Sequence, residues 1–171
     1  MENVSSMNDR EKAFEVYVCK ESFRFNAAHF MAYPGFRERL HGHNYRAAVR
    51  IEGSLGPDGY VLDFGDIKSA TRGVCGEMNE RLLVPLESDC LTIRRSGGQV
   101  EIETEDGSRF SIPEADCALL PIAHSSAEEL AAYLCDRLIA ELEVLRSRDV
   151  RSIEVTVAET PGQEARHLRR L

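Results

Sequence analysis

The chain has 171 residues, of which 43% are hydrophobic and 29% are charged, so it is long enough for one domain with a substantial core. Its formal net charge of -8 at pH 7 argues against a nucleic acid or an anionic membrane as the main partner. Five scattered cysteines without a CxxC pair favour reduced thiols. The polar first residues do not resemble a signal peptide, and no apolar run is long enough for a membrane helix. We therefore expect a cytoplasmic protein.

Two strands are predicted in the first third of the chain. The polar, charged residues 1–13 are expected to form a disordered lead. Apolar–polar alternation in residues 14–30 predicts a strand that bends near Lys20 and Glu21. Residues 44–53 predict a second strand, and the two strands are candidates for an antiparallel hairpin.

A helix and a group of hairpins are predicted next. Residues 61–85 carry apolar side chains at helical spacing, with Asp63 or Asp66 as the N-cap, although two internal glycines weaken the pattern. Residues 86–121 are expected to be a hairpin insertion, because Gly-Gly and Asp-Gly pairs separate short alternating runs within it.

The strongest helical pattern covers residues 125–145, with Ser125 or Ser126 as the N-cap. Residues 150–160 alternate strictly and predict the last strand. This order of elements predicts the α+β class, an antiparallel sheet with helices on one face, in a single domain over residues 14–171.

Three of the five histidines lie within fifteen residues of one another: His29, His41 and His43. His41 and His43 are two apart, so both imidazoles point to one face of a strand. His29 continues the inward parity of the first predicted strand, so pairing of the two strands would bring the three rings together. Imidazole is the commonest zinc ligand, and three histidines leave a fourth position open. The alternative is three unrelated polar residues near a turn.

Two glutamate side chains each allow two interpretations. Glu159 extends the inward parity of the last predicted strand, where it would grip a ligand with paired N–H donors, or it lies beyond the strand end in solvent. Glu38 lies between two arginines and three residues before His41. It is either a solvated loop charge or a general base beside a metal-bound group.

Five motifs in order, "FNAAHF", "LHGHNY", "VLDFGDIK", "SSAEELA" and "VAET", resemble the 6-pyruvoyl-tetrahydropterin synthase family, which includes the bacterial 6-carboxy-tetrahydropterin synthases. The resemblance implies the tunnelling fold, a four-stranded antiparallel sheet with two helices on one face. It also implies a homo-oligomer, a trimer or a hexamer of two trimers, with active sites between subunits.

The resemblance also implies the residues of the site. Zinc (Zn2+) would be bound by His29, His41 and His43. Glu159 would hold the pterin ring through its 2-amino and N3 edge, and Ser126, with its neighbour Ser125, would lie by the pterin pocket. The substrate would be the small molecule 7,8-dihydroneopterin triphosphate, with no nucleic acid or membrane partner. Its phosphates need cations, for which the sequence offers four candidates: Arg37, Arg39, Arg46 and Lys68.

The chain departs from the family pattern at two places. Where the typical synthase has a catalytic cysteine, four residues before the first histidine of HGH, this chain has Arg37. Where the typical enzyme has an Asp-His pair after the first helix, this chain has Asn79 and Glu80, which makes Glu80 a catalytic candidate. The usual cysteine proton shuttle is therefore absent.

"FRERLHGHNY" and the hairpin insertion resemble a subgroup, known from malaria parasites and some bacteria, in which a glutamate replaces the cysteine. That subgroup is associated with cleavage of the substrate side chain to 6-hydroxymethyl-7,8-dihydropterin, a folate precursor. Glu38 would then be the base of a zinc-dependent lyase. The alternatives are ordinary 6-pyruvoyl-tetrahydropterin synthesis, on the tetrahydrobiopterin pathway, and a catalytically degenerate module that binds pterin and zinc.

Overall fold

The main sheet has six strands in the order β11-β10-β4-β1-β5-β9. The computed structural model describes residues 13–171, so all but the last residue of the predicted lead lies outside the described part. The strands are β1 (Phe14–His29), β4 (His41–Gly53), β5 (Arg81–Pro85), β9 (Cys117–Leu120), β10 (Val150–Thr160) and β11 (Gln163–Arg170). β11, β10, β4 and β1 form the expected four antiparallel strands, and β5 and β9 extend them in parallel.

The predicted hairpin partners β1 and β4 are the two longest strands and pair antiparallel. The register between them shifts between Cys19 and Arg24, where the sequence predicted a bend. An irregularity of this kind bends a strand and increases its twist. Beyond it the pairing is regular to the strand end, where His29 lies opposite His41.

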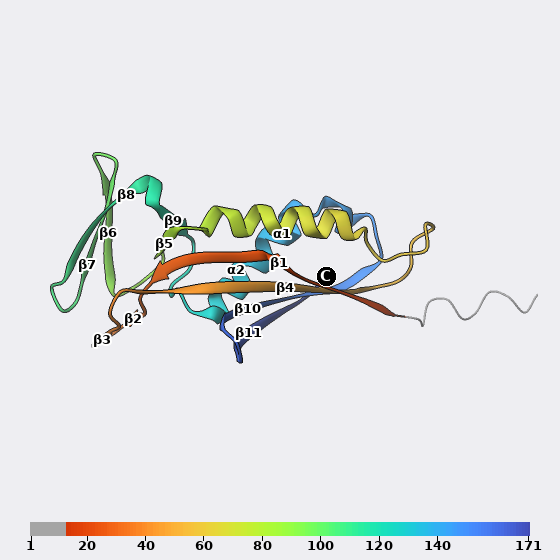
Figure 1. Cartoon of the computed structure of the whole chain (residues 1–171), viewed down its shortest axis with the longest axis horizontal. Helices are drawn as coiled ribbons and strands as arrows, with labels where there is room; N and C mark the ends of the chain where they lie inside the picture. The colour runs from red at the N-terminus through yellow and green to blue at the C-terminus, as the bar shows by residue number, and fades with distance from the viewer. Residues whose placement is uncertain (1–12) are drawn as a thin grey trace, which may run out of the picture.

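Two helices, α1 (Phe64–Met78) and α2 (Ala127–Glu141), pack against the sheet, and Figure 1 shows α1 running along β1 and β4. The α+β prediction is confirmed. Asp63 caps α1 by accepting a hydrogen bond from the Gly65 amide, and Ser126 caps α2 by accepting one from the Glu129 amide. Each of these bonds satisfies an amide that has no partner within the helix.

The predicted helix over residues 61–85 is wrong in its last part. α1 ends at Met78, and the backbone then turns through Glu80, the one non-glycine residue with positive φ among those described. The apolar run that follows becomes the buried strand β5 beside β1. A short apolar run has no period that distinguishes a buried strand from a helix. The second helix likewise ends earlier than predicted, at Glu141, and a 3-10 turn (Glu143–Arg146) follows it.

The sequence analysis predicted β10 to be the last strand and missed β11. Its residues that face the helices are Ala165, His167 and Arg169, which do not form an apolar stripe. β11 is an edge strand, paired with β10 alone, and an edge strand requires little burial.

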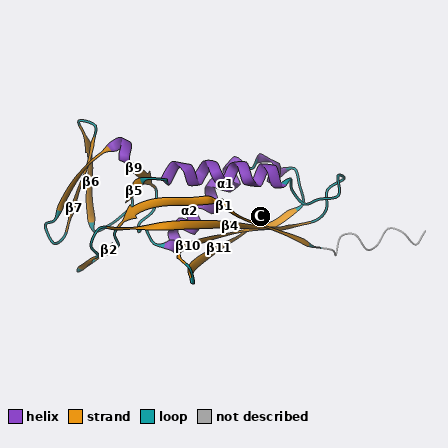
Figure 2. Cartoon of the chain, in the orientation of Figure 1, coloured by secondary structure: helices purple, strands orange, loops and turns teal. Residues whose placement is uncertain are grey.

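The predicted insertion over residues 86–121 is wrong in its last part, because β9 belongs to the main sheet and pairs with β5. The rest forms a separate three-stranded sheet of β6 (Leu91–Ser96), β7 (Gln99–Thr104) and β8 (Arg109–Pro113), followed by a 3-10 turn (Glu114–Asp116). We call this three-stranded sheet the insert. A small hairpin, β2 (Ala32–Tyr33) and β3 (Phe36–Arg37), lies at the same end of the molecule, and Figure 2 shows both as strands.

The apolar core has two parts. The larger part fills the space between the helices and the sheet, and includes one face of α2, formed by Leu130, Leu134 and Leu138, all fully buried. The smaller part joins the insert to β5, β9 and the segment before β2; it contains Phe30, Ala32, Leu82, Val84, Val100, Ile102 and Cys117.

The described residues contain no helix that is long and apolar enough to cross a membrane. All five cysteines are free, and Cys75 and Cys135 are buried in the helices as expected for small core residues.

Replacement of Leu134 by Ala is expected to lower the free energy of unfolding by about 2–5 kcal/mol, because it leaves a cavity in the larger core. Leu168→Ala, on the exposed side of β11, is the matched control and should change stability by less than about 0.5 kcal/mol. Urea unfolding measures both, and equal losses would contradict the assignment of the core.

Candidate metal and substrate site

The three histidines meet where β1 and β4 end. His29 pairs with His41 and Ala27 pairs with His43, so the three imidazoles project from the same face of the sheet. The ring centroids are 4.6 Å apart for His29 and His41, and 5.1 Å apart for His29 and His43. One nitrogen from each ring lies within 4.8 Å of the others, close enough to share a metal ion. The convergence predicted from strand parity is confirmed.

His29 is 2% exposed and is held by the loop before α2. Its Nδ1 lies 2.9 Å from the carbonyl oxygen of Ser125, to which it donates as the neutral tautomer. Its Nε2 is buried and has no hydrogen-bond partner among the described residues. Burial lowers the pKa of His29 to about 4, so the ring is neutral near pH 7 and Nε2 offers an unused lone pair.

His41 is oriented in the same way. Its Nδ1 lies 2.8 Å from the carbonyl oxygen of Arg39, so the neutral ring donates there and leaves Nε2 as the acceptor. Backbone carbonyls that fix the tautomer are the usual partners of metal-bound histidines. Three imidazoles with an open position fit Zn2+.

The histidines line a pocket of about 420 Å³ together with Glu38, Glu159 and Ser126. Glu159 lies within β10, half-buried, at an irregularity in the pairing between Ala158 and Thr160. This position agrees with the inward reading of Glu159 and disagrees with the solvent reading.

Glu38 also faces this pocket and is held by the backbone. Its carboxylate accepts a hydrogen bond from the Met31 amide, at 3.1 Å, and its own amide donates to the Met31 carbonyl, at 2.9 Å. The segment from Met31 to Glu38 therefore folds back on itself and brings Glu38 to His29, whose pKa it raises slightly against the larger effect of burial. Glu38 is not a freely solvated loop charge.

The two serines have different positions. Ser126 caps α2 and lines the pocket. Ser125 is buried, and besides holding His29 it donates its hydroxyl to the Phe30 carbonyl at 3.2 Å. Ser125 therefore supports the metal site from behind and is not among the residues that line the pocket.

Glu80 does not line the histidine pocket. It lines a more open pocket of about 580 Å³ with Leu40, Gly42 and His43. Its amide donates to the Asn26 carbonyl at 2.6 Å, which holds it at the α1–β5 turn. A catalytic role for Glu80 stays a prediction, and one chain does not bring it together with Glu38.

The pocket is acidic, and none of the four predicted phosphate-binding cations lines it. Among residues 13–171 its lining contains no lysine or arginine, and it contains four carboxylates, those of Glu38, Glu128, Glu159 and Glu164. Arg37 contacts Asp106, and Arg46 contacts Glu21 on the opposite face of the sheet.

The sequence analysis missed the residues that β11 contributes to the pocket lining, although the Pro161-Gly162 turn after β10 is a hairpin signal.

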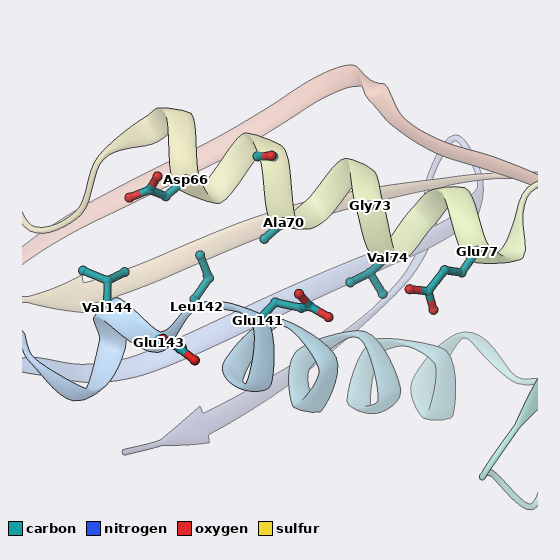
Figure 3. Close-up of a pocket in the computed structure, with 10 residues that line it drawn as sticks. Asp66, Ala70, Gly73, Val74, Glu77, Glu141, Leu142, Glu143 and Val144 are labelled. Carbon is teal, nitrogen blue, oxygen red and sulfur yellow. The ribbon is translucent and has the colours of Figure 1, made fainter.

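A second, larger groove of about 470 Å³ lies between the two helices (Figure 3). Carboxylates surround it, among them Asp66, Glu77, Glu141 and Glu143, and its described lining includes no histidine or cysteine and, of the serines, Ser69 alone. The described lining of the groove therefore lacks the histidine cluster that distinguishes the smaller pocket.

The burial of His29 predicts a pH dependence in the metal-free protein. Between pH 6.5 and 4 the unfolded chain binds a proton on His29 and the folded chain does not. The free energy of unfolding therefore falls by up to about 3 kcal/mol as the pH is lowered through this range. A His29→Gln variant should lack this part of the dependence. Urea unfolding across this range measures the difference, and parallel curves for the two proteins would contradict it.

Comparisons with known proteins agree with this geometry. The family profile described as 6-pyruvoyl tetrahydropterin synthase matches residues 17–169. A Methanocaldococcus jannaschii protein, named provisionally as a 6-carboxy-5,6,7,8-tetrahydropterin synthase, is 30% identical over 143 residues, covering 83% of this chain and 87% of the relative.

Two solved structures from malaria parasites are also similar. A Plasmodium vivax 6-pyruvoyltetrahydropterin synthase, in which alanine replaces a catalytic glutamate, has 40% identity and a TM-score of 0.90, covering 94% of this chain and all of that one. The Plasmodium falciparum 6-pyruvoyl tetrahydropterin synthase has 42% identity and a TM-score of 0.89, covering 93% of this chain and 99% of that one.

Proposed function

Because the chain belongs to the 6-pyruvoyl tetrahydropterin synthase family, a family of lyases with the tunnelling fold, we propose that it cleaves the side chain of 7,8-dihydroneopterin triphosphate. The products are 6-hydroxymethyl-7,8-dihydropterin, for folate synthesis, and a two-carbon aldehyde that carries the triphosphate. The observation that carries the proposal is Glu38, held in the pocket beside three histidines in a chain without the usual cysteine.

The P. vivax relative supports this role for a glutamate, since its catalytic residue is a glutamate that was replaced by alanine. In this chain the carboxylate of Glu38 accepts one hydrogen bond from the Met31 amide, at 3.1 Å. A carboxylate accepts through two oxygens, so Glu38 keeps capacity for a substrate hydroxyl.

The chemistry assigned to the site needs one base. Glu38 accepts the proton of the 2′-hydroxyl, the bond between C1′ and C2′ breaks, and C2′ becomes the aldehyde carbon. The electron pair passes into the dihydropterin ring, and C1′ takes a proton to give the hydroxymethyl group. A Zn2+ ion held by His29, His41 and His43 would lower the pKa of the side-chain hydroxyls.

We assign recognition of the pterin to Glu159. A carboxylate accepts two parallel hydrogen bonds, which matches the 2-amino and N3 donors of a pterin ring. Glu159 is half-buried in the same pocket as Glu38, and the α2 cap Ser126 lies on the pocket wall. The two carboxylates therefore have separate tasks, one on the ring and one on the side chain.

The second candidate function is 6-pyruvoyl-tetrahydropterin synthesis, which eliminates the triphosphate instead of breaking a carbon–carbon bond. The names of the two Plasmodium relatives favour it. Both reactions use the same substrate and the same metal, so the product distinguishes them.

We also propose that the protein works in the cytoplasm as a homo-oligomer, a trimer or hexamer. In the described part of the chain β11 pairs only with β10, and the first half of β1 pairs only with β4, so both strands leave an open edge for neighbouring copies. The described residues that line the pocket supply no lysine or arginine for a triphosphate, and we assign that cation to a neighbouring subunit.

Removal of metal tests the histidine site. The purified protein should hold about one Zn2+ per chain, and a chelator should abolish turnover reversibly. His41→Ala should remove the metal, whereas His124→Ala, outside the cluster, should keep it. Elemental analysis measures both, and full zinc in the His41 variant would contradict the assignment.

Product analysis tests the reaction. Mass spectrometry after incubation with 7,8-dihydroneopterin triphosphate should detect 6-hydroxymethyl-7,8-dihydropterin, and Glu38→Ala should lower kcat by about 10²–10⁴-fold. Glu101→Ala on the insert is the control and should retain full turnover. Formation of the pyruvoyl compound alone would refute the cleavage, and binding of pterin without turnover would identify a degenerate module.

A further inference from the structure

The insert contacts the segment that carries Glu38 through one arginine. The Nε of Arg37 donates to a carboxylate oxygen of Asp106 at 2.9 Å, and one terminal nitrogen donates to the Ser108 hydroxyl at 3.1 Å. The other terminal nitrogen donates to the backbone carbonyl of Glu38 at 2.9 Å. Arg37 therefore joins the turn between β7 and β8 directly to the backbone of the proposed base.

A second contact holds the turn of the β2–β3 hairpin. Gly35, at the turn between β2 and β3, donates its amide to the Glu105 carboxylate at 2.9 Å. Glu105 and Asp106 are neighbours in the β7–β8 turn, and no backbone ladder joins the insert to β2 or β3. The hairpin is thus attached to the insert by side chains from one short turn.

Asp106 is itself fixed in place. Its carboxylate accepts hydrogen bonds from the Thr104 hydroxyl and, at 2.9 Å, from the Ser108 amide. These bonds, with the smaller effect of Arg37, hold the pKa of Asp106 well below its usual range, so it stays charged. A preorganised, charged acceptor holds the planar guanidinium of Arg37 in one orientation.

Apolar contacts lie behind these polar ones. Phe30, which directly follows His29, stacks on Phe110 of β8 with ring centroids 5.2 Å apart. The guanidinium of Arg37 lies 5.8 Å from the centre of the same Phe110 ring. The insert therefore contacts the segment between the first histidine and Glu38 at its start, at its turn and at its end.

We propose that the insert positions Glu38, and that Arg37 and Asp106 are positioning residues for the base. The catalytic consequence rests on the proposed function, but the positioning itself does not. Arg37 stands where relatives of the usual type have the catalytic cysteine, so in this chain the position holds the base in place.

Amide exchange tests the positioning without any substrate. In Asp106→Ala, and also in Arg37→Ala, the Met31 and Glu38 amides should exchange about tenfold faster, because their mutual hydrogen bonds lose the support of the insert. Amides in the centre of β10 should keep their wild-type rates. Arg109→Ala, which removes an exposed ion pair with Glu103 on the same sheet, is the control. Unchanged exchange at Met31 and Glu38 would overturn the proposal.

Turnover then tests whether the positioning acts through Glu38. Asp106→Ala should lower kcat by about tenfold or more and change KM by less than about twofold. In a Glu38→Ala background, measured with enzyme in excess, Asp106→Ala should cause no further loss. An equal loss in both backgrounds would show a general structural effect and overturn the proposal. If the wild-type protein fails to turn over the substrate, the proposed function fails, and the exchange rates still decide whether the insert holds Glu38.

Discussion

The register between β1 and β4 is the constraint on which the site depends. It places His29 opposite His41 and sets His43 one step further along the same face. A slip of one residue would turn one strand's side chains to the other face of the sheet and separate the rings. The pair next to the histidines, Phe25 and Tyr45, stacks with ring centroids 4.8 Å apart and is fully buried. The apolar core therefore fixes the register that the polar site requires.

The site lies at the edge of that core, where burial disfavours the charged forms of the side chains that line the pocket. Three imidazoles and four carboxylates, among them Glu38 and Glu159, line a pocket to which the described residues contribute no lysine or arginine. Burial raises the pKa of Tyr45, and the same two carboxylates raise it further. A cluster of this kind is balanced by a bound cation, which relieves the repulsion between carboxylates and uses the buried Nε2 of His29. The electrostatics and the ligand geometry thus indicate the same occupant.

Much of this arrangement was predictable from local sequence pattern, and the failures have physical causes. The alternation of β1, β4 and β10 records one buried face, so parity alone placed His29, His43 and Glu159 on it. β5 was read as helix because both of its faces are buried, and β11 was missed because its inward face is polar. The contact between Arg37 and Asp106 joins residues 69 positions apart on two separate sheets, which no local pattern records.

The bond between His29 and the Ser125 carbonyl has a consequence for biosynthesis. Its partners are 96 positions apart, and the loop that contains Ser125 takes its place only when α2 packs on the sheet. A nascent chain that has emerged only as far as β4 carries all three imidazoles but lacks the carbonyl that orients the first of them. If the cluster holds the proposed ion, its capture at full affinity would belong to the end of translation, when the C-terminal half docks, and metal occupancy would report that folding is complete.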